Sequence, residues 1–328
     1  MLFENIELNN FKNLEFYQKP FYLRMEAEKI GGIALYYKYE SENATFVIPV
    51  IKRLIEKDYY DLISPYGYSG FLSNNDSPEF IMEGIHHFDN YCKANNIITS
   101  FIRLHPFNNY IFLENKRIAQ VLHGRVIFFS LNQNYDELYS FYSSNHKRGI
   151  KKLQKRGFNI KQGDVSDIRE FITIYNHTME RLDAKEFYFF EEDYYVALMK
   201  NEKCKLLFVE SPDQKLCAAA FFVISSEIIQ YHLGGTLTEF LQDAPIKLLF
   251  DFIINSHSNS NMKFNLGGGL GGSEDNLYKF KEGFSNEKIK FSTLRIVHNQ
   301  DVYNNLTSNF DKEDRKNISE FFPLYRKK

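Results

Sequence analysis

Cysteine and long apolar runs are scarce in this sequence of 328 residues, and tryptophan is absent, so Phe and Tyr supply all the aromatic rings. The three cysteines, Cys92, Cys204 and Cys217, have neither a tight pairing nor a metal-ligand spacing, which favours reduced, buried thiols over a disulfide framework. The longest apolar runs, such as residues 217–224, fall far short of the roughly 20 residues that span a bilayer. The first residues show no basic segment leading into an apolar one. We therefore expect a cytosolic protein with no membrane span and no secretory signal.

Signatures of metal-dependent and covalent hydrolysis are missing as well. The sequence holds no HExxH, no CxxC and no serine-centred nucleophile elbow. His86 and His87 are neighbours on a predicted helix, so they face different directions and make no metal pair. We expect no metal site and no bound cofactor.

The composition is otherwise that of a globular protein, and its length favours two domains. Hydrophobic residues make up 44% of the chain and charged residues 25%, with 40 basic side chains against 42 acidic ones. Domains commonly hold about 100 to 200 residues, and a chain of this length buries a core in each of two.

The two halves share one order of predicted elements: three strands, a turn, a helix opened by a proline and a further strand. The first-half elements are the strands Gly32 to Tyr39, Thr45 to Ile51 and Tyr60 to Ser64, the turn PYGYSG, a helix capped by Ser77 and the strand ITSFIRLHP. The second-half elements are the strands Lys205 to Glu210, Leu216 to Ile224 and Glu227 to Leu233, the turn Gly234-Gly235, the helix IKLLFDFIINS and the strand MKFNL. The offset from Pro78 to Pro245 is 167 residues and from Phe101 to Phe264 it is 163, which indicates an internal repeat.

This order predicts an α/β protein with mixed sheets and helices on their faces. Antiparallel strands come first in each half, and a helix then crosses to a further strand. We expect an N-terminal domain over residues 1–157, a C-terminal catalytic domain over 158–296, and a polar segment 297–328 that packs on the first domain.

Positive charge is concentrated in one stretch. Residues 103–161 hold 11 Lys or Arg against 3 acidic residues, or +8, so the rest of the chain carries −10. Within it, HKRGIKKLQKRG predicts a helix ending at Gly157, with Ile150 and Leu153 on the apolar side. Its stacked cations are Lys147, Lys151 and Lys155, and Arg148, Lys152 and Arg156. This face suits phosphates of an RNA or of a diphosphate-linked substrate, and a merely solvated helix is an equal alternative.

A glycine-rich loop and the helix after it carry the second concentration of chemistry. LGGGLGGSED contains G-x-G-x-x-G from Gly267, but too little chain follows to build a dinucleotide-binding sheet. We interpret the glycines as allowing close approach of a ligand, with Ser273 capping the next helix. A lysine there, Lys279 or Lys281, would hold a phosphate or stabilise an oxyanion, or would simply be solvated, and Phe280 would otherwise be core.

Taken together, these segments resemble a known family. The order PYGYSGFL, FIRLHPFNN, KRGIKKLQKRG, NHTMERL with FYFF, YHLGGT, and NLGGG with DNLYKFKEGFS is similar to the Fem family of peptidoglycan interpeptide-bridge transferases and to related GNAT-like acyltransferases. The resemblance covers residues 16 to about 295. The first and last of these elements are the most specific.

The resemblance implies two tandem GNAT-like domains and transfer of an aminoacyl group from tRNA to an amine of a lipid- or nucleotide-linked acceptor. It implies that Lys281 faces the reacting carbonyl or the tRNA end and that Tyr231 is an active-site tyrosine. Independently of the resemblance, we expect the proton of the attacking amine to leave through Tyr231, Asp275 or the substrate itself. Arg181 would meet the phosphates of the acceptor. The resemblance also implies substrate contacts at Tyr66, Gly67 and Phe280. We further expect substrate contacts at Tyr68, Arg103, Tyr188, Gly268 and Gly269.

The sequence departs from the family pattern in three places. The turn reads PYGYSGF where the family has PRGP, which loses an arginine. No heptad segment forms the coiled-coil arm that some Fem enzymes insert. GGTLTEFLQDAP, before Pro245, lacks the closely spaced glycines that cradle a pyrophosphate, which disfavours acyl-CoA as the donor.

We therefore expect an acyltransferase that forms an amide on an amino-bearing sugar or peptide precursor of the cell envelope, with aminoacyl-tRNA as donor. It would work in the cytoplasm, at the inner face of the membrane where the acceptor is lipid-linked. One alternative is an N-acyltransferase that uses acyl-CoA to modify amino sugars of surface polysaccharide. Another is a binding module for envelope precursors or RNA that does not catalyse, and the need for Lys281 in turnover separates it from an enzyme.

Overall fold

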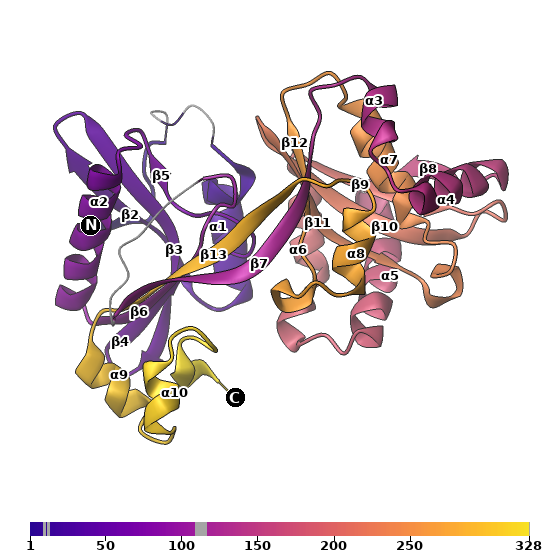
Figure 1. Ribbon diagram of the computed structural model, residues 1–328. Coiled ribbons are helices and arrows are strands. Elements are labelled where there is room, and N and C mark those ends of the chain that lie inside the picture. The colour runs from indigo at the N-terminus through magenta and orange to yellow at the C-terminus, as the bar shows by residue number, and fades with distance from the viewer. Residues whose placement is uncertain (9–10, 12–13, 109–116, 328) are drawn as a thin grey trace. The chain divides into compact units, whose positions relative to one another are not determined.

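The computed structural model describes residues 1–8, 11, 14–108 and 117–327, which form two compact units (Figure 1). Unit 1 comprises Met1–Gly124 and Lys290–Lys328, and unit 2 comprises Arg125–Ile289. The chain passes between them within β7 (Ile118–Ser130) and again within β13 (Lys288–Val297). Glu114 and Lys116 of the basic stretch lie outside the described residues.

Unit 1 is built on the strand order β1-β2-β3-β4-β6-β13. All neighbours are antiparallel except β4 and β6, which are parallel and joined by α2. A short strand, β5, pairs with β3. The elements are β1 (Leu2–Phe3), α1 (Pro20–Lys29), β2 (Ile33–Ser41), β3 (Ala44–Glu56), β4 (Tyr59–Ile63), β5 (Leu72–Ser73), α2 (Pro78–Ala94), β6 (Ile97–Arg103), α9 (Gln300–Leu306) and α10 (Lys312–Lys316).

Unit 2 repeats this plan with the order β8-β9-β10-β11-β12-β7. Only β11 and β12 are parallel, and α7 joins them as α2 joins β4 and β6. The internal repeat and the mixed α/β class predicted from the sequence are thus confirmed. The elements are α3 (Tyr135–Ser140), α4 (Ser144–Lys155), β8 (Asn159–Gln162), α5 (Ile168–Arg181), α6 (Glu192–Met199), β9 (Cys204–Glu210), β10 (Leu216–Ile224), β11 (Ile228–Thr236), α7 (Ile246–Ser256), β12 (Lys263–Gly267) and α8 (Asn276–Glu282).

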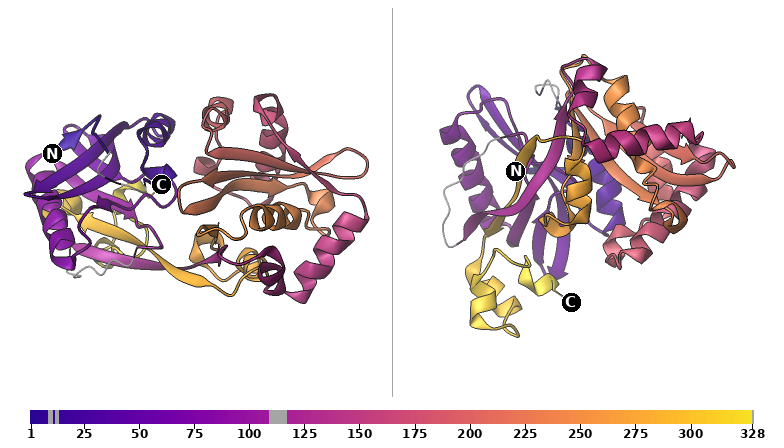
Figure 2. Two further views of the ribbon diagram at one scale, coloured as in Figure 1. Left: turned by 90° about the horizontal axis from the view of Figure 1, so that it is seen from above. Right: turned by 45° about the vertical axis from the view of Figure 1, so that its right-hand side comes forward.

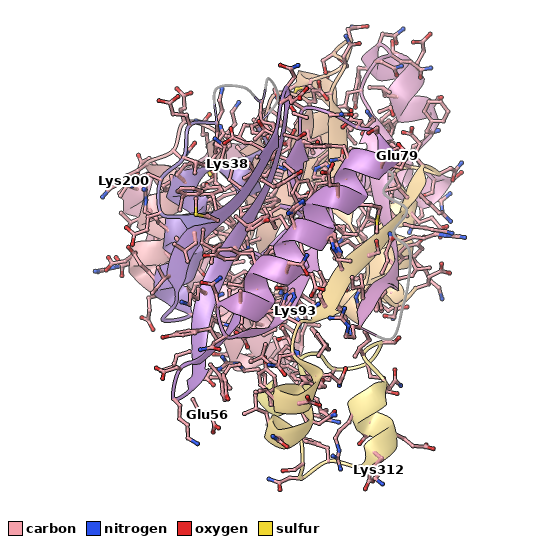
Figure 3. The ribbon with its side chains drawn as sticks, turned by 90° about the vertical axis from the view of Figure 1, so that its left-hand side faces the viewer. Lys38, Glu56, Glu79, Lys93, Lys200 and Lys312 are labelled. Carbon is pink, nitrogen blue, oxygen red and sulfur yellow. The ribbon has the colours of Figure 1, made fainter. Side chains whose placement is uncertain are left out.

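Alternation along the strands sends neighbouring side chains to helices on opposite faces of each sheet. In unit 1, Tyr36 joins the core beneath α1, while Tyr37 packs with Phe88 of α2. In unit 2, Phe221 packs on Phe171 of α5, and the next residue faces α7. Figure 2 shows α5 and α6 on one face of the unit 2 sheet and α7 on the other, and Figure 3 shows α2 lying along the unit 1 sheet from Glu79 to Lys93. Each unit therefore has apolar core on both faces of its sheet.

The proline-opened helices begin as the sequence indicates. Ser77 caps α2, since its side chain accepts a hydrogen bond from the amide of Phe80 at 3.3 Å, and Pro78 takes the first helical position. The buried side of α2 carries apolar residues at helical spacing, each contributing roughly 1.5 to 3 kcal/mol relative to an exposed side chain: Phe80, Ile81, Ile85 and Phe88. No helix among the described residues combines the length and the apolar character that crossing a membrane requires.

The division into units differs from the expected boundary at residue 157. Residues 125–157 are part of unit 2, because Ile127–Ser130 of β7 pair with β12 and because Ile150 and Leu153 of α4 pack in the same core as Leu249 of α7. Residues 290–297 are part of unit 1, where Thr293–Val297 pair with β6. Charge density marks the helix but says nothing about which core receives its apolar side.

The C-terminal segment packs within unit 1 through an apolar cluster and a buried polar chain. Tyr303, Phe322 and Leu324 share a core cluster with Ile98 of β6. His298 binds Asp89 Oδ1 through Nδ1 at 2.8 Å and Ser100 Oγ through Nε2 at 2.7 Å. This order of Ser, His and Asp is that of a serine hydrolase, but the serine is fully buried. These two hydrogen bonds therefore connect His298, which directly follows β13, to α2 and to β6.

Candidate functional site

The candidate site of unit 2 lies where the two parallel strands part. β11 and β12 are paired only at Ile228–Gln230 and Lys263–Asn265. Beyond this point β11 continues to Thr236, while β12 ends at Gly267, whose positive φ of 80° turns the chain into the glycine-rich loop. Beyond the last pair, the backbone groups of β11 and β12 are thus not hydrogen-bonded to each other.

Lys281 occupies this opening. Its Nζ donates to the carbonyl oxygen of Gly268 at 2.7 Å and lies 5.7 Å from the ring centre of Tyr231. The side chain is only 5% exposed, so it is buried rather than solvated, which overturns the alternative of a solvated lysine. Burial lowers the pKa of Lys281 to about 7, although the charge of Asp275 acts in the opposite direction. An amine with a pKa near neutrality exchanges a proton readily and still supplies a positive charge.

The glycine-rich loop is packed so closely that two of its positions exclude a side chain. A Cβ on Gly269 would lie 2.1 Å from the carbonyl oxygen of Ser273, and one on Gly268 would lie 2.9 Å from that of Arg125. The loop therefore needs glycine for its own fold. The role of Gly268 and Gly269 in substrate binding stays a prediction.

Asp275, rather than Ser273, caps the helix after the loop, which corrects the sequence-based expectation. Its side chain accepts from the amide of Tyr278 at 2.9 Å, and α8 begins at the next residue, Asn276. The same carboxylate influences Lys281 electrostatically. The cap position therefore holds a negative charge at the start of the helix that carries the lysine.

Tyr231 borders the lysine from β11. Its ring packs edge-on against Phe250 at 4.9 Å between centres, and burial raises the pKa of its hydroxyl. A raised pKa keeps the phenol protonated near neutral pH, so the group is a hydrogen-bond donor rather than a base. The Tyr231 hydroxyl lies against Gly234, where a Cβ would come within 2.6 Å of it.

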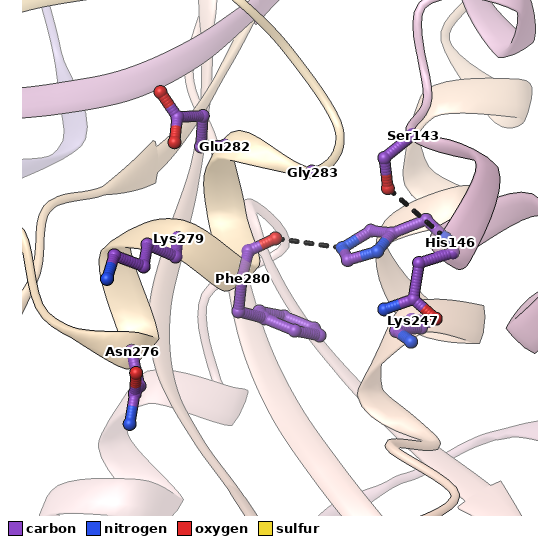
Figure 4. Close-up of a pocket in the computed structure, with 9 residues that line it drawn as sticks. Ser143, His146, Lys247, Asn276, Lys279, Phe280, Glu282 and Gly283 are labelled. Carbon is purple, nitrogen blue, oxygen red and sulfur yellow. Dashed lines mark hydrogen bonds between the residues drawn. The ribbon is translucent and has the colours of Figure 1, made fainter.

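Residues at the start of α4 form hydrogen bonds with the end of α8, the helix that carries Lys281. His146 Nε2 donates to the carbonyl oxygen of Phe280 at 2.8 Å (Figure 4), and the Ser143 amide donates to the carbonyl oxygen of Gly283 at 2.8 Å. A Cβ on Gly283 would meet the His146 ring at 2.5 Å, so glycine is needed there as well. Phe280 is half-buried and packs on this ring, as its alternative role in the core requires, and its predicted contact with substrate stays a prediction.

A pocket of about 490 Å³ opens beside this contact. It is lined by Ser143, Asn145, His146, Lys247, Asn276, Lys279, Phe280, Glu282 and Gly283. Sequence reasoning missed His146 and Lys247. A signal was present for Lys247, because it is a cation within the apolar helix IKLLFDFIINS, yet only the fold shows that its side chain is buried.

The arginine predicted to meet the acceptor contacts the end of β11, and the predicted aromatic contact, Tyr188, lies in the segment that follows α5. Arg181 Nη1 donates to the carbonyl oxygen of Thr236 at 3.0 Å and to Thr238 Oγ1 at 3.1 Å. The ring of Tyr188 lies 3.9 Å from that of Phe187, and its carbonyl oxygen accepts from the hydroxyl of Tyr175. The contacts of Arg181, the last residue of α5, place its guanidinium at the end of β11, the strand that also carries Tyr231.

The predicted basic helix is α4, which ends at Lys155 and is followed by Gly157 with a φ of 84°. Part of its charge is already paired, because Lys152 and Arg156 both bind Asp243. Lys147 Nζ donates to the carbonyl oxygen of Ser140 at 2.7 Å. Besides Lys147, which is half-buried, the cations of α4 that form no ion pair within the described part of the chain are Arg148, Lys151 and Lys155, and these three are exposed.

The candidates of the first half lie together in unit 1. Arg103 Nη1 donates to the carbonyl oxygen of Ser64 at 3.1 Å, just before the PYGYSG turn, and the Tyr66 amide donates to Glu26 Oε2 at 3.1 Å. Gly67, with a φ of 95°, packs against Tyr17, whose ring a Cβ would meet at 2.8 Å. The ring of Tyr68 packs edge-on against Phe291 at 5.0 Å.

Comparison with known proteins gives a likeness of structure. No family model and no curated sequence matches the chain. The crystal structure of FemX matches with a TM-score of 0.70 over 92% of this chain and 98% of that one, at 12% identity. The C-terminal domain of a putative lysylphosphatidylglycerol synthetase from Agrobacterium fabrum matches with a TM-score of 0.53 over 87% and 88%, at 12% identity. L-PGS from Bacillus licheniformis matches with a TM-score of 0.51 over 86% and 93%, at 14% identity. The chain therefore has the fold of these proteins.

Proposed function

We propose, for a chain with the fold seen in FemX, that it is an acyltransferase which forms an amide on an amino-bearing cell-envelope precursor, with aminoacyl-tRNA as the acyl donor. The observation that carries this proposal is Lys281: a buried amine, held at the Gly268 carbonyl oxygen, where the parallel strands of unit 2 part. The sequence resemblance and the likeness of fold support the same reaction class.

The chemistry asks little of the protein. The acceptor amine attacks the carbonyl carbon of the aminoacyl ester, a C–N bond forms, the C–O bond to the ribose breaks, and the proton lost by nitrogen ends on the leaving oxygen. Lys281 would stabilise the developing oxyanion as an ammonium, beside the protonated hydroxyl of Tyr231. Positioning and charge stabilisation suffice, because the ester is already activated.

The start of α7 supports tRNA over acyl-CoA as the donor. Acyl-CoA binding to a GNAT-like domain would use free amides at this helix start to cradle a pyrophosphate. Here the amide of Lys247 donates to the carbonyl oxygen of Ala244 at 3.1 Å, and that of Leu248 donates to that of Pro245 at 2.9 Å. Two amides that could bind a pyrophosphate are therefore already used.

The acceptor contacts stay predictions. Arg181 would meet a phosphate of the acceptor at the end of β11, and Tyr188 would be a further contact. In unit 1, the predicted contacts are Tyr66, Gly67, Tyr68 and Arg103. Each is tested by its own substitution, read as a rise in the KM for the acceptor.

The deciding experiment measures amide formation between an aminoacylated RNA minihelix and a nucleotide-linked amino-sugar peptide, with Lys281→Met as the variant. Loss of one oxyanion donor costs about 3 to 4 kcal/mol, so turnover should fall about a hundred- to a thousandfold, with little change in acceptor affinity. Lys200→Met serves as the control, because Lys200 is an exposed lysine at the end of α6. A parallel reaction with acyl-CoA tests the other donor.

A turnover of Lys281→Met within about twofold of the wild type would remove the catalytic assignment. Product from acyl-CoA, but not from the charged minihelix, would select the alternative N-acyltransferase. Binding of both substrates with no product from either would leave a binding module.

A further inference from the structure

The pocket beside the α4–α8 contact holds a buried cation without a counter-ion. Lys247 is 7% exposed, and no carboxylate of the described residues lies within ion-pair distance of it. Its Nζ lies 6.0 Å from the ring centre of Phe280 and close to Gly149. Burial lowers the pKa of Lys247. An unpaired buried ammonium is costly, and an anion from a ligand would provide it with a partner.

The other charged side chain of the pocket that has no ion pair among the described residues is also a cation. Lys279 of α8 lines it and is exposed, and the lining carboxylate, Glu282, is already bound to Lys288. The first turn of α4, a helix of 12 residues, also borders the pocket and adds the positive end of its dipole. These groups come from three elements and favour an anion with several oxygens, such as a phosphate, over a single carboxylate oxygen.

His146 also borders the pocket, and one of its ring nitrogens lacks a hydrogen-bond donor, which a fully ionised phosphate would not supply. His146 is 4% exposed, and its Nε2 must carry the proton, because it donates to the carbonyl oxygen of Phe280. Burial, with the charge of Lys247 beside it, lowers the pKa of His146 to about 4, so the ring is neutral and Nδ1 is an acceptor. Nδ1 is buried and has no hydrogen-bond partner in the described part of the chain. It calls for a donor such as a hydroxyl group.

We propose that this pocket binds a ribonucleotide, with a phosphate on Lys247 and a ribose hydroxyl donating to His146 Nδ1. This inference rests on the proposed function, since a nucleotide-bearing acyl donor supplies both groups. It assigns the donor a binding site separate from Lys281, and the His146–Phe280 hydrogen bond joins the two. Figure 4 shows the Phe280 ring and Lys247 on the same side of the imidazole.

The test measures binding by titration calorimetry with four probes: a single-stranded RNA ending in CCA, the same sequence as DNA, coenzyme A, and inorganic pyrophosphate. The wild type should bind the RNA more tightly than the DNA, which lacks the 2′-hydroxyl. Lys247→Met keeps the apolar stem, and it should weaken RNA binding about tenfold or more and lower its salt slope by about 0.7. Lys247→Arg should recover most of the affinity, and Lys200→Met should bind as the wild type does.

The outcomes separate the sources of the phosphate and the two proposals. Loss of coenzyme A binding, but not of RNA binding, in Lys247→Met would assign the site to a CoA donor. The site would be refuted if Lys247→Met bound every probe within twofold of the wild type, if the wild type bound none of them, or if RNA and DNA bound equally. Full activity of Lys281→Met, together with abolished RNA binding in Lys247→Met, would refute the proposed catalytic role and leave the site intact.

Discussion

His146 Nε2 lies 2.8 Å from the carbonyl oxygen of Phe280, and so the basic helix α4 holds the backbone next to the buried Lys281. The contact joins residues 134 positions apart in the chain. It gives α4 a second role besides presenting charge, because its first turn fixes the end of α8. The position of Lys281 therefore depends on a residue outside the glycine-rich loop.

We expect His146→Ala to loosen this end of α8. The substitution leaves the Phe280 carbonyl without its hydrogen-bond donor and creates a cavity in place of the buried imidazole. Together these losses should lower the free energy of unfolding by about 2 to 4 kcal/mol. Turnover should fall while the acceptor KM stays the same. His146→Gln keeps a side-chain N–H and should recover part of both losses. Chemical denaturation and initial rates measure the two effects, and an unchanged turnover of His146→Ala would contradict a positioning role.

Lys281 should make stability depend on pH. Its pKa falls from 10.5 in the unfolded chain to about 7 in the fold, so between these values the unfolded state binds the extra proton. The free energy of unfolding should therefore rise as the pH increases from about 7 towards 10, by an amount on the order of a few kcal/mol. Lys281→Met should lack this rise. The check is chemical denaturation of both proteins from pH 7 to 9.5, where parallel curves would contradict the shift.

Arg148, Lys151 and Lys155 should account for the salt dependence of RNA binding by α4. These are its exposed cations outside the Asp243 ion pairs, so a triple change to Gln should lower the salt slope by about 0.7 for each phosphate of a single-stranded RNA that the helix no longer binds. The matched control changes three exposed lysines of unit 2: Lys200, Lys203 and Lys215. Equal salt slopes in the two triple variants would contradict RNA binding by α4 and favour the alternative that this helix is merely solvated.

Asp89→Asn should destabilise unit 1 strongly. Burial alone would raise the pKa of Asp89, but hydrogen bonds from His298 and Lys93 lower it to about 2. Removing one member of a buried charged network typically costs about 3 to 5 kcal/mol. The wild type should also lose the contribution of this carboxylate as the pH falls from about 4 towards 2, and the variant should not. Glu42→Gln, at an exposed turn, is the control for denaturation at both pH values.

The repeated order of elements along the chain was predictable because it depends on local signals. Apolar runs, helix-opening prolines and turn glycines recur at a nearly constant offset and specify the same elements in both units. The unit boundary was not predictable, because β7 and β13 each contribute residues to both units, and no composition change marks a strand that crosses between cores.

For the site, the sequence by itself determined that a lysine follows a glycine-rich loop near Tyr231, as the resemblance to Fem enzymes indicates. Only the tertiary structure decided that Lys281 is buried with a lowered pKa, that Asp275 caps α8, and that Asp243 binds two cations of α4. It alone brought His146 and Lys247 to one pocket. The physical reason is that burial and electrostatic pairing depend on which distant elements pack together, whereas helix and strand signals act over a few neighbouring residues.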